Sequence, residues 1–187
     1  MADILFCSDL HFYHSNIIRY SSRPYSDVAE MNYELIHNWN EIVKPDDVVY
    51  NLGDFSFGSY DKTRNVLKQL NGKIHFIYGN HDKVIKKHEE ELLGDGLLVS
   101  TAYDREIYVG KQMLVLHHYG KRVWNKSHHG SIHLYGHSHG SLPPYGKSVD
   151  VGVDCKEITD EYRPVHIDEV LAYMATRNQE VVDHHGT

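Results

Sequence analysis

The chain has little of what defines several other classes of protein. Its two cysteines, Cys7 and Cys155, are too few for a disulfide framework, so we expect a reducing, cytoplasmic environment. No apolar run approaches the roughly 18 residues of a membrane helix, and we expect no signal peptide, because a strand-like segment begins almost at once. Basic residues are also scarce, with 19 lysines and arginines against 26 acidic residues. We therefore expect no membrane association and no stable binding of duplex nucleic acid.

Histidine is the one unusually frequent residue, with 16 copies. Many of the histidines stand with aspartate, asparagine or glycine in five short motifs, each directly after an apolar, β-prone run. The motifs are Asp9-Leu10-His11, Gly53-Asp54, Gly79-Asn80-His81-Asp82, His117-His118 and Gly136-His137-Ser138-His139. Ligands of α/β sheets bind beyond the carboxyl ends of the strands. The placement of the motifs therefore predicts that their side chains meet at one edge of a sheet.

The predicted strands and helices alternate in the first half of the chain, and strands predominate in the second half. Apolar, β-prone runs predict strands at residues 4–8, 48–52, 74–78, 97–101, 104–109, 112–117, 132–135, 149–153 and 165–167. Helical spacing predicts a helix that begins at Asp27, with Glu30 as its capping-box partner, and that Pro45 ends. It also predicts helices at residues 60–70 and 83–93, and a last helix that Asp168 caps and that runs to about residue 175. We expect one α/β domain over residues 1–177, with two sheets packed between helices, and a loose tail over residues 178–187.

The chemistry of the motif side chains favours divalent metals. Carboxylates, imidazoles and an amide oxygen suit manganese, iron, zinc, nickel or cobalt, whereas magnesium or calcium prefers an all-oxygen site. Two cations need a shared anionic ligand, and an aspartate can bridge them. Asp9 and Asp54 offset only half the charge of two divalent ions, so the remaining positive charge favours a hydroxide and a phosphate anion. We expect two divalent ions, and manganese is the metal we favour.

In this order, the five motifs resemble those of the calcineurin-like metallophosphoesterase family over residues 9–139. Residues 9–14, 23–24 and 38–40 also look like a small phage and bacterial subgroup of that family. The resemblance implies a four-layer sandwich of two mixed β-sheets flanked by helices, the metallo-dependent phosphatase-like fold. One departure is Gly120 after His118-Tyr119, where the family often has proline.

The resemblance also implies a ligand set for each metal. One ion would be held by Asp9, His11, Asp54 and His139. The other would be held by Asp54, Asn80, His118 and His137, so that Asp54 bridges the two. Of the adjacent His117 and His118 only one should reach the metal, because neighbouring strand residues point to opposite faces. The motif match favours His118.

In a two-metal site the ions lower the pKa of a water and orient the phosphate for in-line attack. Asp54 would serve this chemistry as the bridging ligand. His81 would face the substrate and protonate the leaving oxygen as general acid. To keep its proton beside cations it needs an anionic or hydrogen-bonding neighbour, and Asp82 is the candidate.

We therefore expect hydrolysis of a small phosphate ester, with nucleotides among the candidates. The segment after Asp54 lacks the arginine with which protein Ser/Thr phosphatases hold a dianionic phosphate, which favours diesters slightly over monoesters. Weaker candidates for substrate contact are His14, Arg23 and Arg122. The alternatives are a nuclease acting on DNA or RNA ends, which the acidic balance disfavours, and a non-catalytic metal-bound scaffold, against which the intact ligand set argues. The sequence predicts no particular oligomeric state.

Overall fold

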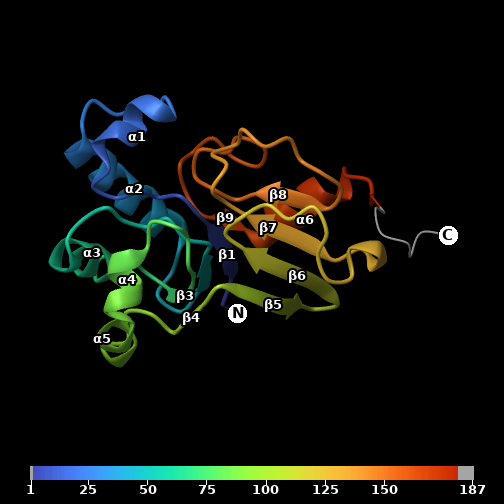
Figure 1. The fold of residues 1–187 in the computed structure, drawn as a ribbon, viewed down its shortest axis with the longest axis horizontal. Helices are drawn as coiled ribbons and strands as arrows, with labels where there is room; N and C mark the ends of the chain where they lie inside the picture. The colour runs from blue at the N-terminus through green and yellow to red at the C-terminus, as the bar shows by residue number, and fades with distance from the viewer. Residues whose placement is uncertain (1, 181–187) are drawn as a thin grey trace.

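The structure, a computed structural model, describes residues 2–180 and contains two β-sheets side by side (Figure 1). The first sheet has the strand order β4-β3-β2-β1-β9 and the second has the order β5-β6-β7-β8. The strands of the first sheet are β1 (Ile4–Cys7), β2 (Val48–Asn51), β3 (Lys73–Ile77), β4 (Ser100–Ala102) and β9 (Val165–His166). Those of the second are β5 (Asp104–Val109), β6 (Gln112–His117), β7 (Ile132–Tyr135) and β8 (Ser148–Asp150).

Both sheets are mixed. In the first, β1 to β4 are parallel and β9 pairs antiparallel with β1. In the second, β6, β7 and β8 are parallel, and β5 pairs antiparallel with β6 through a tight turn at residues 110–111. Parallel neighbours bring their carboxyl ends to the same edge of each sheet, which is the edge where the sequence motifs stand.

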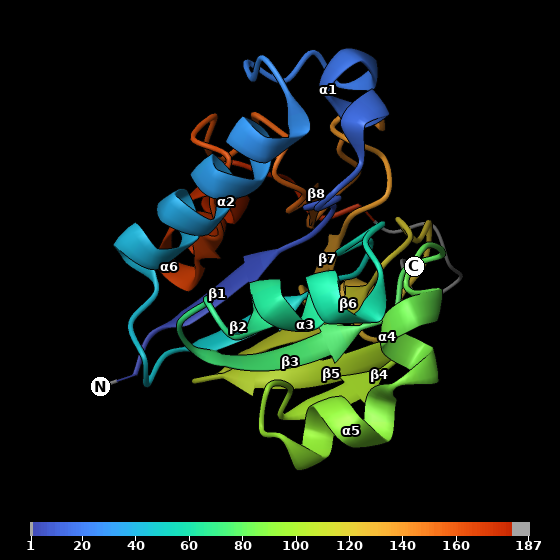
Figure 2. The same cartoon turned by 90° about the vertical axis from the view of Figure 1, so that its left-hand side faces the viewer.

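Most helices cover the outer face of the first sheet (Figures 1 and 2). The helices of this layer are α1 (Ser15–Tyr20), α2 (Val28–Ile42), α3 (Tyr60–Leu67), α4 (Lys83–Lys87) and α5 (Glu89–Gly94). α6 (Ile167–Ala175) packs instead into the core between the sheets through Val170 and Met174. On the outer face of the second sheet, Trp124 packs with Met113 and Val115 beside the 3-10 helix η1 (Ser127–His129). The expected fold of two mixed sheets flanked by helices is confirmed.

The first sheet is buried on both faces, and its side chains alternate between two cores. In β1, Leu5 and Cys7 face the helices, whereas Phe6 faces the second sheet. Phe6 meets a group of fully buried residues from both sheets that includes Leu116 and Leu134. Burial on both faces explains why this strand reads as a continuous apolar run. Among residues 2–180, no helix has both the length and the apolar character needed to cross a bilayer.

The helix predicted to begin at Asp27 is confirmed as α2, and Asp27 is its N-cap, since its Oδ1 accepts the N–H groups of Ala29 and Glu30. The predicted capping box is wrong, because the Glu30 carboxylate accepts the N–H of Ser26 instead. The predicted helix at residues 83–93 is wrong in one respect, since it breaks at His88 into α4 and α5. The predicted cap of the last helix is also wrong. The ring of His166, rather than Asp168, caps α6.

The strand predicted at residues 149–153 ends early, at Asp150, because the chain then crosses from one sheet to the other. Gly152 forms an isolated bridge with Ser8, and the N–H of Val153 donates to the carbonyl of Ser8 at 3.1 Å. This crossing ties the carboxyl ends of the two sheets together. In the expected tail, residues 178–180 have no regular structure and residues 181–187 lie outside the described part.

Candidate metal centre

The loops that follow the strands have unusual backbone conformations. Nine residues other than glycine have a positive φ within residues 2–180, and five of these are expected metal ligands. The five are Asp9 (58°), His11 (53°), Asp54 (54°), His137 (68°) and His139 (47°). Such conformations are unfavourable for residues with a Cβ and persist where the surrounding structure holds them, often at functional sites. The concentration of this strain at one edge of the sheets marks the edge as the candidate site.

Asp9, His11 and His139 form a first group of potential ligands. One donor atom from each lies within 4.8 Å of the others. Asp9 Oδ1 and both ring nitrogens of His11 are buried and have no hydrogen-bond partner among residues 2–180. Burying polar atoms without a partner costs free energy, and a cation is the partner that a carboxylate and imidazoles together fit. The first group therefore has the donor chemistry of a metal site.

Asp54, His118 and His137 form a second group, with one donor atom of each again within 4.8 Å of the others. Asn80 joins it, because its Oδ1 lies 3.1 Å from His118 Nε2. His117 does not: its Nδ1 lies 3.1 Å from the carbonyl oxygen of Tyr119, away from the group. Of the two adjacent histidines, the structure brings His118 to the site.

Asp54 lies between the two groups. Its Oδ2 is 3.8 Å from His11 Nε2 and 3.5 Å from His118 Nε2, separations typical of two ligands that share one ion at about 2.1 Å. Its Oδ1 accepts the backbone N–H of His81 at 2.9 Å. Burial alone would raise the pKa of Asp54, but the interactions with His118 and the N–H of His81 outweigh it and lower the pKa to about 2. Asp54 is therefore an ionised carboxylate within reach of a ring nitrogen from each of the two groups.

Two glycines allow these loops to approach closely. A Cβ on Gly79 would stand 2.2 Å from Asp54 Oδ1, and a Cβ on Gly136 would stand 2.6 Å from Asp9 Oδ2. Both distances are far below van der Waals contact, so neither position has room for a side chain. The glycines that precede Asn80 and His137 in the motifs thus make room for the carboxylates of the site.

Hydrogen bonds to Nδ1 of His118 and His139 leave Nε2 as the ring nitrogen that can bind a metal. His118 Nδ1 lies 2.7 Å from the carbonyl oxygen of Leu52, and His139 Nδ1 lies 2.6 Å from Asp154 Oδ2. Both partners are acceptors, so Nδ1 must carry the proton and Nε2 presents its lone pair. Metal-binding histidines are commonly oriented in this way. Burial and the neighbouring His139 lower the pKa of His11 to about 3, which keeps that ring neutral as a ligand must be.

Asp154, which the sequence analysis missed, connects the site to Arg23. Its carboxylate accepts from Arg23 Nε at 2.8 Å and from Arg23 Nη2 at 2.7 Å. Arg23 also donates to the carbonyl oxygens of Asp9 and Leu10 at 2.7 and 2.8 Å, and its side chain is fully buried. The predicted contact of Arg23 with substrate is therefore wrong. This arginine holds the Asp9 loop and orients His139 through Asp154. Asp154 directly follows the strand predicted at residues 149–153, but it belongs to none of the five motifs, and the motif search therefore passed over it.

Asp82, expected beside the ring of His81, is also placed differently. Its carboxylate accepts three backbone N–H groups, from Asp54, Phe55 and Gly79, at 2.7–2.9 Å. Both oxygens are thus engaged in joining the loops after β2 and β3. The exposed ring of His81 packs instead against Phe57, with the ring centroids 4.6 Å apart.

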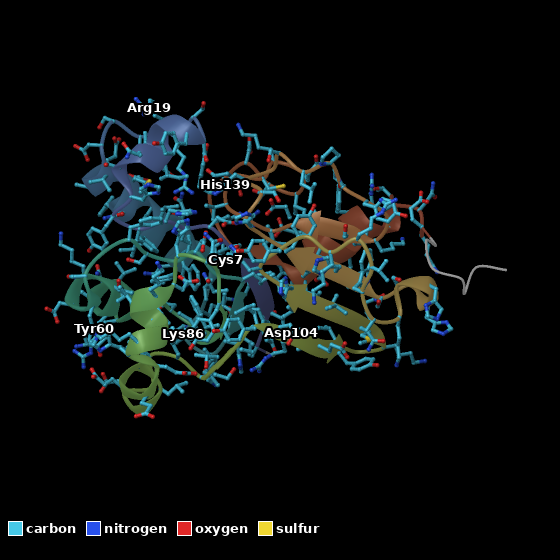
Figure 3. All side chains as sticks on the ribbon, viewed as in Figure 1. Cys7, Arg19, Tyr60, Lys86, Asp104 and His139 are labelled. Atoms are coloured by element: carbon cyan, nitrogen blue, oxygen red, sulfur yellow. The ribbon has the colours of Figure 1, made fainter. Side chains whose placement is uncertain are left out.

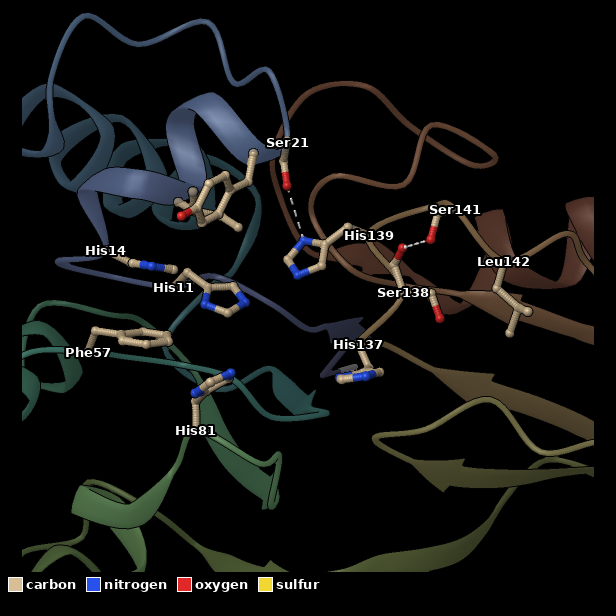
Figure 4. A pocket seen from close by; sticks show the side chains of 12 residues that line it. His11, His14, Ser21, Phe57, His81, His137, Ser138, His139, Ser141 and Leu142 are labelled. Atoms are coloured by element: carbon tan, nitrogen blue, oxygen red, sulfur yellow. Dashed lines mark hydrogen bonds between the residues drawn. The ribbon is translucent and has the colours of Figure 1, made fainter.

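An open cavity of about 830 Å³ lies over the site. His11, His81, His137 and His139 surround its centre (Figure 4), and His139 lies where the two halves of the molecule meet (Figure 3). His14 lines the same cavity and stacks on Phe57 at 4.0 Å.

The cavity also has walls that the motifs did not indicate. They include Ile17, Tyr20 and Ser21 from α1 and Ser138, Ser141 and Leu142 from the loop after β7. The stretch at residues 12–25, in which the sequence predicted no element, therefore supplies one side of the cavity through α1. Arg122 lies outside this cavity, over the ring of Tyr145.

Comparison with known proteins agrees with this geometry. A sequence profile of the calcineurin-like phosphoesterase superfamily domain matches residues 2–149. The chain belongs to this superfamily and is a metal-dependent hydrolase of phosphate esters.

The similarity to individual proteins extends over most of the chain. An uncharacterized protein of Methanocaldococcus jannaschii is 36% identical over 174 residues, which are 91% of this chain and 90% of that protein. A protein of unknown function from Aquifex aeolicus has a similar structure, with a TM-score of 0.68 and 22% identity over 92% of this chain and 99% of that one. An archaeal phosphodiesterase shares the fold at a TM-score of 0.51 and 18% identity, over 80% of this chain and 82% of that chain.

Proposed function

We propose that this protein hydrolyses small phosphodiesters with two divalent metal ions, and phosphomonoesters less well. The observation that carries the proposal is the position of the Asp54 carboxylate, whose Oδ2 stands between His11 Nε2 and His118 Nε2 at the base of an open cavity. A single bridging carboxylate between two imidazole-containing ligand groups is what a dinuclear site needs, because it offsets the repulsion between the ions.

The ligand set follows from the two groups. One ion would be held by Asp9, His11, Asp54 and His139, and the other by Asp54, Asn80, His118 and His137. When bound, the two cations would lower the pKa of a water molecule and offset the negative charge of the phosphate oxygens. The mixture of oxygen and nitrogen donors favours manganese, iron, zinc, nickel or cobalt over magnesium and calcium, and manganese is our first choice.

His81 is the proposed general acid. Its backbone N–H donates to Asp54 Oδ1, and its exposed ring lines the cavity against Phe57. The backbone of His81 is thus anchored to the proposed bridging carboxylate, while its ring is exposed to the cavity where substrate would bind. In this position it would donate a proton to the oxygen of the departing alcohol, which makes that group a better leaving group.

The charge of the cavity supports a preference for diesters. No lysine or arginine is among the residues that line it in the described part of the chain, and its hydroxyl groups come from Tyr20, Ser21, Ser138 and Ser141. The buried Arg23 is engaged with Asp154 and with two carbonyl oxygens. A monoester carries a second negative charge that finds no side-chain cation here, whereas a diester carries one charge for the metal ions.

The test compares bis-p-nitrophenyl phosphate with p-nitrophenyl phosphate after metal removal and reloading with one metal at a time. We expect manganese-dependent turnover of both esters with kcat/KM at least several-fold higher for the diester. Metal content of about two ions per chain in the active preparation is the second expected result. Turnover that survives complete metal removal, or one ion per chain at full activity, would contradict the dinuclear mechanism. A higher kcat/KM for the monoester would contradict the diester preference.

A further inference from the structure

A second cavity, of about 330 Å³, adjoins the cavity over the metal centre. Residues 120–122 and 142–145 form most of its wall, together with Tyr135 and Ser148. Leu142 lines both cavities. Gly120 lies directly under it, since a Cβ on Gly120 would stand 2.7 Å from Leu142 Cδ2. The two cavities are therefore neighbours that share one exposed leucine side chain.

This second cavity has the positive charge that the first one lacks. Lys121 and Arg122 both line it. The guanidinium carbon of Arg122 lies 3.6 Å from the centroid of the Tyr145 ring, which is close stacking contact. A guanidinium stacked on a ring keeps its N–H donors directed outward in its own plane, where they fit a phosphate or carboxylate.

Arg122 has no anionic partner among the residues that the structure describes. Over residues 2–180 its exposed side chain makes no hydrogen bond or ion pair, and its contact is with the Tyr145 ring. By contrast, Arg64 and Arg163 are paired with carboxylates at 2.5–2.7 Å. In a chain with a net charge of −7, an unpaired arginine held by an aromatic ring beside the catalytic cavity is placed to bind an anion.

The positions of Arg122 and His81 indicate which ester group of the substrate lies near Arg122. Phe57 and His81 lie on one side of the catalytic cavity, and Ser138 and Leu142 lie on the other (Figure 4). If His81 protonates the leaving oxygen, the departing group lies on the side of Phe57. The ester group that stays on the phosphorus then extends toward Leu142 and the second cavity.

We propose that the second cavity binds the retained ester group of the substrate and that this group carries a further anionic substituent held by Arg122. The proposal rests on the phosphodiesterase function proposed above and narrows its substrate class. The reacting phosphate contributes one negative charge at the metal centre, and the second anion lies one ester group away. Pro143, Pro144 and Tyr135 supply an apolar wall for the ring or hydrocarbon that joins the two.

A matched pair of chromogenic esters tests the proposal with the metal-loaded protein. The p-nitrophenyl ester of thymidine 5′-phosphate and its 3′-phosphorylated form release the same nitrophenolate from the same kind of phosphorus. We expect the wild type to cleave the 3′-phosphorylated ester with a kcat/KM about tenfold higher, mainly through a lower KM, since a charge-assisted contact of an arginine with phosphate has this order of strength. In Arg122→Ala the ratio of the two kcat/KM values should fall to about one, and Arg122→Lys should retain part of it.

Lys126→Ala is the matched control. Lys126 Nζ also lies over a tyrosine ring, that of Tyr108 at 5.9 Å, but Lys126 lines neither cavity. Its removal should leave the ratio unchanged. A wild-type ratio near one, or a ratio that Arg122→Ala does not alter, overturns the anionic subsite and leaves the phosphodiesterase function intact.

If neither ester is cleaved with any metal, the proposed function fails, and a binding experiment decides on the subsite. The product thymidine 3′,5′-bisphosphate is titrated into wild type and Arg122→Ala by calorimetry. Weaker binding to the variant by about tenfold supports the subsite, and equal affinity overturns it.

Discussion

Nδ1 of His139 lies 2.6 Å from Asp154 Oδ2, and the same carboxylate forms two hydrogen bonds with the buried guanidinium of Arg23. Burial alone would raise the pKa of Asp154, but the hydrogen bonds and charges of His139 and Arg23 have the larger effect and lower this pKa. The carboxylate of Asp154 is therefore ionised. Because the Nδ1 proton of His139 is thereby held, its Nε2 lone pair faces the first ligand group. A residue with no role in the sequence motifs thus orients one of the proposed ligands.

Asp154→Asn should therefore weaken metal binding without removing a ligand. The amide is nearly isosteric but neutral, so it no longer polarises the His139 ring. We expect the affinity for one of the two ions to fall by roughly 10–100-fold, measured by metal titration of the demetallated protein. Asp160→Asn, at an exposed position, is the control. Unchanged affinity for both ions in Asp154→Asn would show that the contact with His139 is only structural.

His81→Ala and Asp54→Ala should fail in different ways. The first variant loses the proposed proton donor, so we expect kcat to fall by about 100-fold or more while two ions per chain remain. The second loses the carboxylate between the two ligand groups, so we expect lower metal content together with lost turnover. Metal analysis and bis-p-nitrophenyl phosphate turnover on the same samples separate the two effects. Full activity in His81→Ala would remove the general-acid assignment.

Phe57 should be a positioning residue for His81. Its ring lies between those of His14 and His81, with centroid distances of 4.0 and 4.6 Å, and is 40% exposed. Phe57→Ala removes this support, and we expect kcat to fall by roughly tenfold with little change in metal content. Phe57→Tyr keeps the ring and should retain most of the turnover. A purely structural role would instead lower the melting temperature and leave kcat of the folded protein unchanged.

His133 should make the fold less stable in acid. Its Nδ1 lies 2.9 Å from the carbonyl oxygen of Val115, and its Nε2 accepts the backbone N–H of Lys121 at 3.0 Å. The ring is buried in its neutral form, and burial lowers its pKa to about 4. The unfolded chain therefore binds more protons than the folded chain between about pH 6.5 and pH 4, so stability is lost as the pH falls through this window.

Urea unfolding at pH 7.5 and pH 4.5 measures this effect. The change in the free energy of unfolding between the two values should be smaller in His133→Gln than in the wild type, by up to about 3 kcal/mol. The comparison isolates His133, because the other titrating groups are common to both proteins. An identical pH dependence in the two proteins would contradict the assignment.

Much of the fold was predictable because its signals are local. The apolar runs of β1, β2 and β3 and the capped amphipathic pattern of α2 depend on neighbours a few residues away. The predictions were wrong where contacts between residues far apart in the sequence determine the local structure. The chain leaves β8 after Asp150 because residues 152 and 153 pair with Ser8. The cap of α6 is His166, a residue type that capping preferences do not favour.

The order of the motifs along the chain determined which side chains meet, since a parallel sheet brings its strand ends to one edge. Their metal-binding roles remain proposals, as does the choice of His118 over His117, which the geometry supports. What only the tertiary structure decided is the role of three charged side chains around the site. Arg23 looked like a substrate contact but is buried under Asp9, and Asp154 and Asp82 serve the site as acceptors. The physical reason is that a hydrogen bond needs two groups close together in space, and residues 23 and 154 come close only in the folded chain.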